Sequence, residues 1–138
     1  MIALGKIGTY IGGLPHMAVV EVDVDLDSNK TAISERYGGD GWIAHGHLED
    51  VTEKGYDDWK AGAKKGIEWA LEVAKTSKHV QIIRITGMIT DTDPGIVQCA
   101  AAHAVWNALG FVPDDSTLAQ IEKVLANSWQ KYRDGQNH

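Results

Sequence analysis

Four carboxylates recur at every second position in one stretch of the chain, and they are the first residues whose types and spacing could do chemistry. Between residues 19 and 26 apolar side chains alternate with acidic ones, and the acidic set is Glu21, Asp23, Asp25 and Asp27. A period of two is typical of a half-buried strand. Successive carboxylates would then lie about 6.5–7 Å apart on one face, which is too far for strand neighbours alone to clamp Ca²⁺ or Mg²⁺. The pattern therefore predicts either a solvated face balanced by nearby Lys or Arg, or a surface that contacts a basic partner.

Two histidines separated by one glycine, His45 and His47, form the second group. In a strand both imidazoles would point to the same face, and imidazole is a ligand for Zn, Fe, Ni and Cu. Two ligands leave a site incomplete, and a third would have to come from His16, Glu49, Asp91, Asp93 or His103; Asp91, Asp93 and His103 could gather with the pair at one sheet edge. The residues allow a divalent metal as cofactor, but they favour a surface or hydrogen-bonding role for both histidines.

Cys99 and His103 are one helical turn apart and form the third group. A neighbouring histidine can help to activate a cysteine thiolate, which is the nucleophilic form of the side chain. A lone cysteine in an apolar helix is, however, usually a small buried hydrophobe. We favour the buried interpretation, and we interpret Asp93, which precedes Pro94, as a helix cap.

Tryptophan is unusually frequent for a chain with one phenylalanine. The five tryptophans are Trp42, Trp59, Trp69, Trp106 and Trp129. Trp69 and Trp106 fall outside the clearest apolar stripes of their helices, and exposed tryptophan is enriched at protein interfaces. Trp69 and Trp106 are therefore candidate binding residues, the alternative being that they cover the rim of the core.

Composition and charge narrow the classes of function. A length of 138 residues indicates one domain, residues 1–138, and the net charge of −6 disfavours binding to nucleic acid or to an anionic membrane. No apolar run approaches the roughly 20 residues of a membrane helix, and no signal peptide is evident. The single cysteine excludes an internal disulfide, so we expect a reducing, cytoplasmic setting.

The periodicity predicts strands first and helices later. Strands are expected at 19–26, 31–37 and 42–48, with a fourth at 2–11 that its glycines weaken, and another strand at 79–89. Helices are expected at 56–75, 96–109 and 113–132, with a loose tail over 133–138. This β-β-β-α-β-α-α order predicts an α+β two-layer sandwich, with a mostly antiparallel sheet and the helices on one face.

One segment resembles a known family. Residues 65–71 (Lys-Gly-Ile-Glu-Trp-Ala-Leu), the strand 80–86, the turn at Asp93 and the alanine-rich helix that follows resemble domain IV of translation elongation factor G. The resemblance covers about residues 42–109 and implies a left-handed βαβ sandwich. The chain has no Gly-x-x-x-x-Gly-Lys-Ser/Thr loop, its 88–94 loop is short, and it lacks a basic surface. We therefore take an expectation of fold from the resemblance and no functional residue.

These observations favour a non-catalytic binding or assembly protein. Its expected contact residues are Asp23, Asp25, Trp69 and Trp106, and its partner would be another protein or a second copy of the chain. One rival is a small metal-dependent enzyme that uses His45, His47, Asp91, Asp93 and His103. Another rival, which rests on the resemblance alone, is a ribosome-associated factor.

Overall fold

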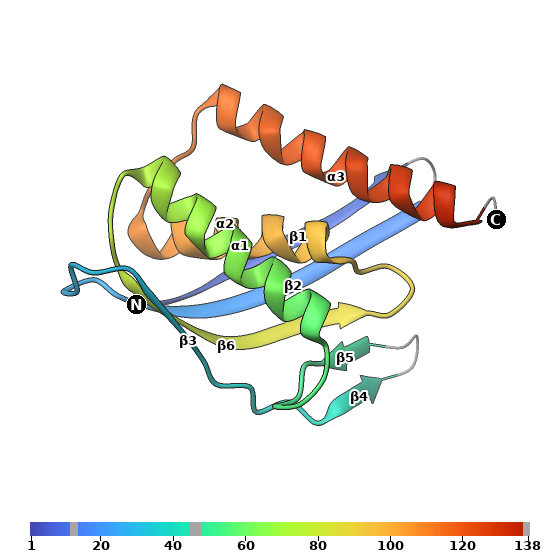
Figure 1. Cartoon of the computed structure of the whole chain (residues 1–138), viewed down its shortest axis with the longest axis horizontal. Helices are drawn as coiled ribbons and strands as arrows, with labels where there is room; N and C mark the ends of the chain where they lie inside the picture. The colour runs from blue at the N-terminus through green and yellow to red at the C-terminus, as the bar shows by residue number, and fades with distance from the viewer. Residues whose placement is uncertain (12–13, 45–47, 137–138) are drawn as a thin grey trace.

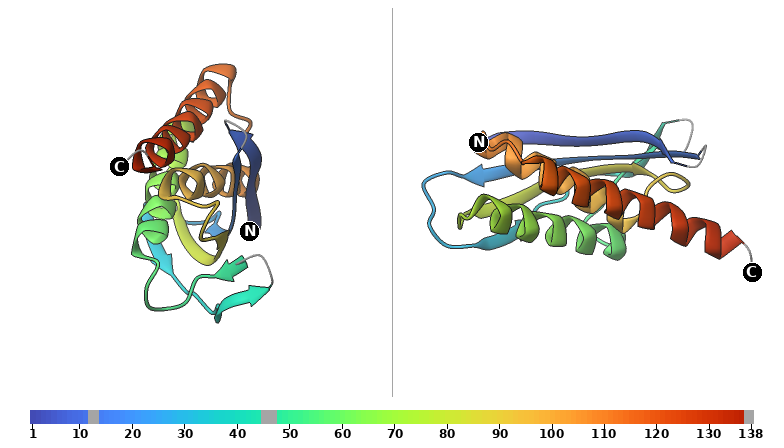
Figure 2. Two further views of the ribbon diagram at one scale, coloured as in Figure 1. Left: turned by 90° about the vertical axis from the view of Figure 1, so that its right-hand side faces the viewer. Right: turned by 90° about the horizontal axis from the view of Figure 1, so that it is seen from above.

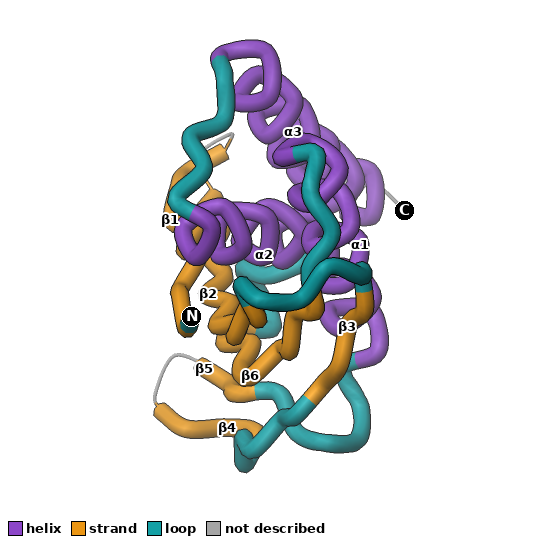
Figure 3. Tube along the Cα trace, turned by 90° about the vertical axis from the view of Figure 1, so that its left-hand side faces the viewer, coloured by secondary structure: helices purple, strands orange, loops and turns teal. Residues whose placement is uncertain are grey.

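The computed structural model describes residues 1–11, 14–44 and 48–136, and it confirms the α+β sandwich (Figure 1). Its strands are β1 (Ile2–Ile11), β2 (Leu14–Asp25), β3 (Ala32–Glu35), β4 (Gly41–Ala44), β5 (Leu48–Asp50) and β6 (His79–Met88). Its helices are α1 (Asp57–Ala74), α2 (Pro94–Leu109) and α3 (Asp115–Gln136). The glycine-containing opening stretch does form a strand, and the last helix continues beyond its predicted end near residue 132. The helices lie on one side of the strands, as Figures 2 and 3 show.

The sheet places β2 between β1 and β6. The strand order is β1-β2-β6-β5-β4, while β3 pairs with β6 in parallel and the other pairings are antiparallel. Asp23 of β2 lies opposite Ile2 on one side and Gln81 on the other. The register between β2 and β6 shifts at Glu21 and Val22. A bulge of this kind bends the strand that carries the extra residue and increases the local twist.

The alternation along β2 separates core from surface as the sequence predicts. Val20, Val22 and Val24 are completely buried on the helix side, where they meet Ile82 and Ile85 of β6. Burying one valine side chain contributes about 1.5–3 kcal/mol of transfer free energy, so a register slip that exposed three of them would be strongly disfavoured. The carboxylates of β2 are therefore held on the opposite face of the sheet.

Helix α2 is the centre of the helical layer. Asp93 caps its first turn, because its Oδ1 accepts a hydrogen bond from the Ile96 amide at 3.0 Å, and Gly110 ends the helix with φ of 68°. Its small side chains are buried on several sides, against α1, α3, β1 and β2. Trp106, 1% exposed, donates its indole hydrogen to the Ala70 carbonyl of α1 at 3.1 Å.

Glycines allow α1 to lie directly against α2. A β-carbon added at Gly62 would overlap the Pro94 carbonyl, and one added at Gly66 would overlap the Gln98 carbonyl. The backbone that these two glycines approach is that of α2. Among the helices that the structure describes, none combines the length and the apolar character that crossing a membrane requires.

Replacing Gly66 with alanine should destabilise the protein. Alanine is the better helix former by about 1 kcal/mol, yet the overlap with the Gln98 carbonyl would force the two helices apart. We expect a net loss of about 1–3 kcal/mol in the free energy of unfolding, measured by urea denaturation. The matched control is Gly8→Ala, whose β-carbon would have no atom within 4 Å. Equal stabilities for the Gly66 variant and the native protein would contradict the close packing.

Candidate functional site

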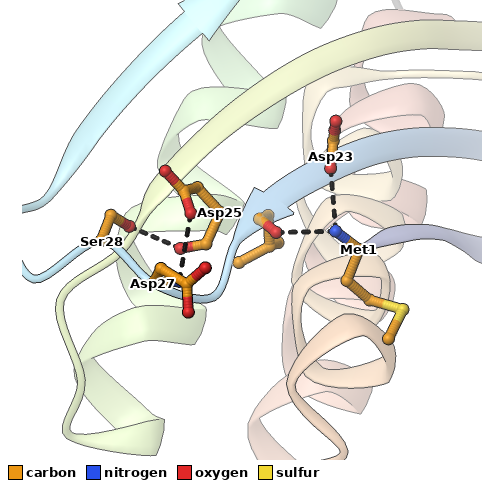
Figure 4. Close-up of polar contacts among 6 residues, drawn as sticks. Met1, Asp23, Asp25, Asp27 and Ser28 are labelled. Atoms are coloured by element: carbon orange, nitrogen blue, oxygen red, sulfur yellow. Dashed lines mark hydrogen bonds and ion pairs between the residues drawn. The ribbon is translucent and has the colours of Figure 1, made fainter.

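The acidic end of β2, comprising Asp23, Asp25 and Asp27, is the strongest candidate site. Asp23 and Asp25 lie on the sheet face opposite the buried valines, and Asp27 lies in the turn that follows the strand (Figure 4). Asp25 and Asp27 are exposed, and Asp23 is partly exposed. The predicted carboxylate face therefore exists, and its last members gather where β2 ends.

Hydrogen bonds fix the backbone around these carboxylates. The Asp27 amide donates to Asp25 Oδ1 at 3.1 Å, and the Ser28 hydroxyl donates to the Asp25 carbonyl at 2.5 Å. The same hydroxyl accepts the His79 amide at 2.8 Å, and Lys78 Nζ donates to the carbonyls of Leu26 and Ser28 at 2.9 Å. The turn after β2 is thus tied to the start of β6, and the acidic side chains project from a supported backbone.

The three carboxylates differ in their charge partners. The Met1 ammonium group lies 3.0 Å from Asp23 Oδ1 and donates to the Val24 carbonyl at 2.9 Å (Figure 4). The other ion pair of the described part of the chain joins Lys64 to Glu35, so neither Asp25 nor Asp27 has a cationic partner there. The two carboxylates nearest the end of the strand therefore remain open to an external cation or cationic side chain.

An open cavity of about 610 Å³ adjoins the acidic end. Its walls are Met1, Asp23, Val24, Asp25, Leu26, Asp27, His79 and Gln81. Sequence reasoning did not identify His79 and Gln81 as site residues. They enter the site because β6 pairs with β2, and a pairing between segments more than fifty residues apart leaves no local signal in the sequence.

The proposed metal ligands have separate positions and partners. Asp93 caps α2, Asp91 Oδ1 accepts the Thr90 hydroxyl at 3.0 Å, and His103 lies within α2. Among the side chains that the structure describes, no three His, Cys, Asp or Glu residues gather as a metal-binding group. His45 and His47 lie outside the described residues, so the metal hypothesis that includes them stays a prediction.

The two candidate tryptophans occupy different environments. The expectation that Trp106 is exposed is wrong, because α1, α2 and the Phe111 ring enclose it and its indole nitrogen is already paired. Trp69 is partly buried, and its ring packs edge-on against Trp106 at a centroid distance of 5.5 Å. One side of Trp69 lines a cavity of about 360 Å³ beside Gln98 of α2 and Gln120 of α3. Of this pair, only Trp69 is accessible to a partner.

Burial also decides between the two interpretations of the Cys99–His103 pair. Cys99 is completely buried, its Sγ lies 3.9 Å from the Ile121 carbonyl, and desolvation raises its pKa to about 12. The thiol is therefore protonated at neutral pH, which confirms its interpretation as a buried hydrophobe rather than a nucleophile. His103 is half-buried, and its ring meets Trp106 edge-on at a centroid distance of 5.4 Å.

His103 should make the fold less stable in acid. Burial lowers its pKa below the ordinary value of 6.5, so the unfolded chain binds a proton more readily than the folded one. Stability is then unaffected well above pH 6.5 and decreases as the pH falls through 6.5 toward the lowered folded-state pKa. His103→Gln should reduce this decrease, measured as urea midpoints between about pH 5 and pH 7.5. Identical pH profiles for the variant and the native protein would show that His103 does not contribute to the pH dependence of stability.

Comparisons with known proteins place the fold but not the function. No protein-family model matches the chain, and no curated protein matches it. A crystal structure of a protein from Thermus thermophilus matches with a TM-score of 0.53 and 16% sequence identity, over 75% of this chain and 14% of that one. This chain thus spans a small part of the length of that protein. The likeness shows a distant relationship of fold, and the specific resemblance to domain IV of elongation factor G stays a prediction.

Proposed function

We propose that this protein is a non-catalytic binding or assembly protein and that it contacts its partner through the acidic end of β2. The observation that carries the proposal is the position of Asp25 and Asp27. Both carboxylates are exposed beside a cavity, on the face of the sheet opposite the helices, and neither has a cationic partner among the described residues. The partner group that fits them is a Lys or Arg side chain of another polypeptide.

Charge and rigidity both support this role. The chain carries a net charge of −6, and an acidic protein accelerates its encounter with cationic groups through long-range attraction. The turn that carries Asp27 is already held by Ser28 and Lys78, so little backbone entropy would be lost on binding. Charged contacts alone contribute little, and the exposed side chain of Leu26 in the cavity wall would supply apolar contact.

The same features favour a protein partner over nucleic acid. Phosphate backbones attract Lys and Arg, whereas the charged side chains in the walls of this cavity include three carboxylates, those of Asp23, Asp25 and Asp27. A reducing, cytoplasmic location belongs to the proposal as well, since the one cysteine is an unpaired, buried thiol.

Neutralising the acidic end should weaken partner capture. Asp25→Asn combined with Asp27→Asn removes two charges and keeps side-chain oxygens that can accept the same local hydrogen bonds. Proteins cross-linked to the tagged native chain in its own cells would be quantified by mass spectrometry. We expect the recovery of a specific partner to fall by about tenfold with the double variant, which corresponds to about 1.4 kcal/mol.

The matched control changes the same charge elsewhere. Glu68→Gln with Glu72→Gln neutralises two exposed carboxylates of α1, in the helical layer, and should leave recovery unchanged. Equal losses in both double variants would indicate an effect of net charge and would reject the acidic end of β2 as the contact surface.

A further inference from the structure

A second cavity continues the first across the same face of the sheet. It measures about 460 Å³, and its walls include Arg36, Arg84, Ile2, Ile83 and Tyr37. Asp23 and Gln81 line both cavities, so the two form one groove. We call it the sheet groove: it begins at Asp25 and Asp27 and ends at Arg36 and Arg84.

Strand register places the two arginines on the groove side. Arg84 lies opposite Glu21, whose neighbours Val20 and Val22 point to the core, so Arg84 shares the carboxylate face. Arg36 follows β3, where its amide bonds to the Ile82 carbonyl at 2.9 Å. The preceding residue, Glu35, faces the helical layer through its ion pair with Lys64 at 2.9 Å, and the alternation along an extended chain turns Arg36 to the other side.

The two ends of the sheet groove carry opposite charges: Asp25 and Asp27 lie at one end, and Arg36 and Arg84 at the other, where Glu21 faces Arg84 across the strands and Asp50 lines the same cavity. Arg36 and Arg84 are exposed, and within the ranges described neither forms an ion pair. Asp25 is four residues from Glu21 along β2, so the acidic end and the level of Arg84 are separated by about 13 Å. Asp23 and Gln81 lie between the ends, so a two-fold axis near them would exchange the acidic end with the arginine end.

We propose that the occupant of the sheet groove is a second copy of this chain, packed face to face about that two-fold axis. In such a dimer Asp25 and Asp27 of each protomer contact Arg36 and Arg84 of its partner, and the same contact forms twice because the interface is self-complementary. This inference rests on the proposed binding role of the acidic end and names its partner. Two sheets can pack in this way at a separation of about 10 Å.

Charge distribution favours a second copy over a uniformly basic partner. A basic segment that satisfied Asp25 and Asp27 would be repelled by Arg36 and Arg84 at the far end of the groove, whereas a second copy matches both ends. Aliphatic side chains between and beside the ends supply apolar contact: Ile2 is 60% exposed, Leu4 is 40% exposed and Ile83 is partly exposed. Arginine flanked by apolar surface is also typical of interface cores.

Charge reversal at each end provides the test. Asp25→Lys with Asp27→Lys makes the groove basic at both ends, and Arg36→Glu with Arg84→Glu makes it acidic at both ends. In sedimentation experiments at intermediate ionic strength and about 100 µM protein, we expect a dimer for the native chain and a monomer for each double variant. An equimolar mixture of the two variants should form the heterodimer, because every repulsive contact then becomes attractive.

Two controls keep the outcome interpretable. Lys65→Glu with Lys123→Glu reverses two exposed cations in the helical layer and should leave the native dimer intact. If a reversed variant does not fold, judged by thermal melting, the milder pair Arg84→Gln with Asp25→Asn should weaken the native dimer by about tenfold or more.

Two results would overturn the inference: a native chain that remains monomeric at about 500 µM, or a mixture of the charge-reversed variants that does not associate. If the chain is monomeric but loses a cross-linked partner when Asp25 and Asp27 are neutralised, the proposed function stands and the second copy is rejected. If neither association depends on these carboxylates, both proposals are wrong.

Discussion

The backbone-to-backbone contact of α2 with its neighbours is the constraint on which the remaining structure depends. Gly62 and Gly66 bring α1 against α2 from one side, and Gly5 brings β1 against Ala100 and Ala104 from the sheet side. Helix axes lie closest where side chains are small, and the alanines of α2 allow this approach on several sides at once. A buried helix with small side chains thereby joins the sheet to the outer helices, and Trp106 fills the volume that the small residues leave.

This packing also determines which face of the sheet is available for function. Since α1, α2 and α3 gather on one side, Val20, Val22 and Val24 of β2 and Ile82 and Ile85 of β6 point there, and the acidic residues that alternate with the valines point away. Antiparallel sheets commonly leave one face to solvent, and charged residues on that face carry little cost in stability. The exposure of the acidic end of β2 and of the two arginines on this face therefore follows from the same alternation that builds the core.

The features of the fold and of the candidate site that the sequence predicts are those that depend on interactions between residues close together in the chain. The alternation in β2, the cap at Asp93 and the amphipathic pattern of α1 are local, and each produces the expected element. The position of Trp106 is not local: its place off the apolar stripe indicates exposure only if α2 has one buried side, and α2 is buried on several. Gln81 and Arg84 join the site through pairing of β6 with β2, which periodicity does not reveal.

The net charge of the chain is a poor guide to its contact surface, because it does not show how the tertiary fold arranges the individual charges. A value of −6 describes the encounter at low ionic strength, where the Debye length is long and the protein acts from a distance as a single negative body. At contact, the arrangement of the charges determines the interaction, and the sheet groove carries Asp25 and Asp27 at one end and Arg36 and Arg84 at the other. Two copies repel each other at long range and attract each other once the groove ends are aligned. Added salt should first tighten the association, because it screens the long-range repulsion. At higher concentrations salt should weaken the association, because it also screens the attraction between the carboxylates and the arginines. Such a maximum at intermediate ionic strength is characteristic of alternating charge and would not arise from a uniformly acidic face that binds a uniformly basic partner.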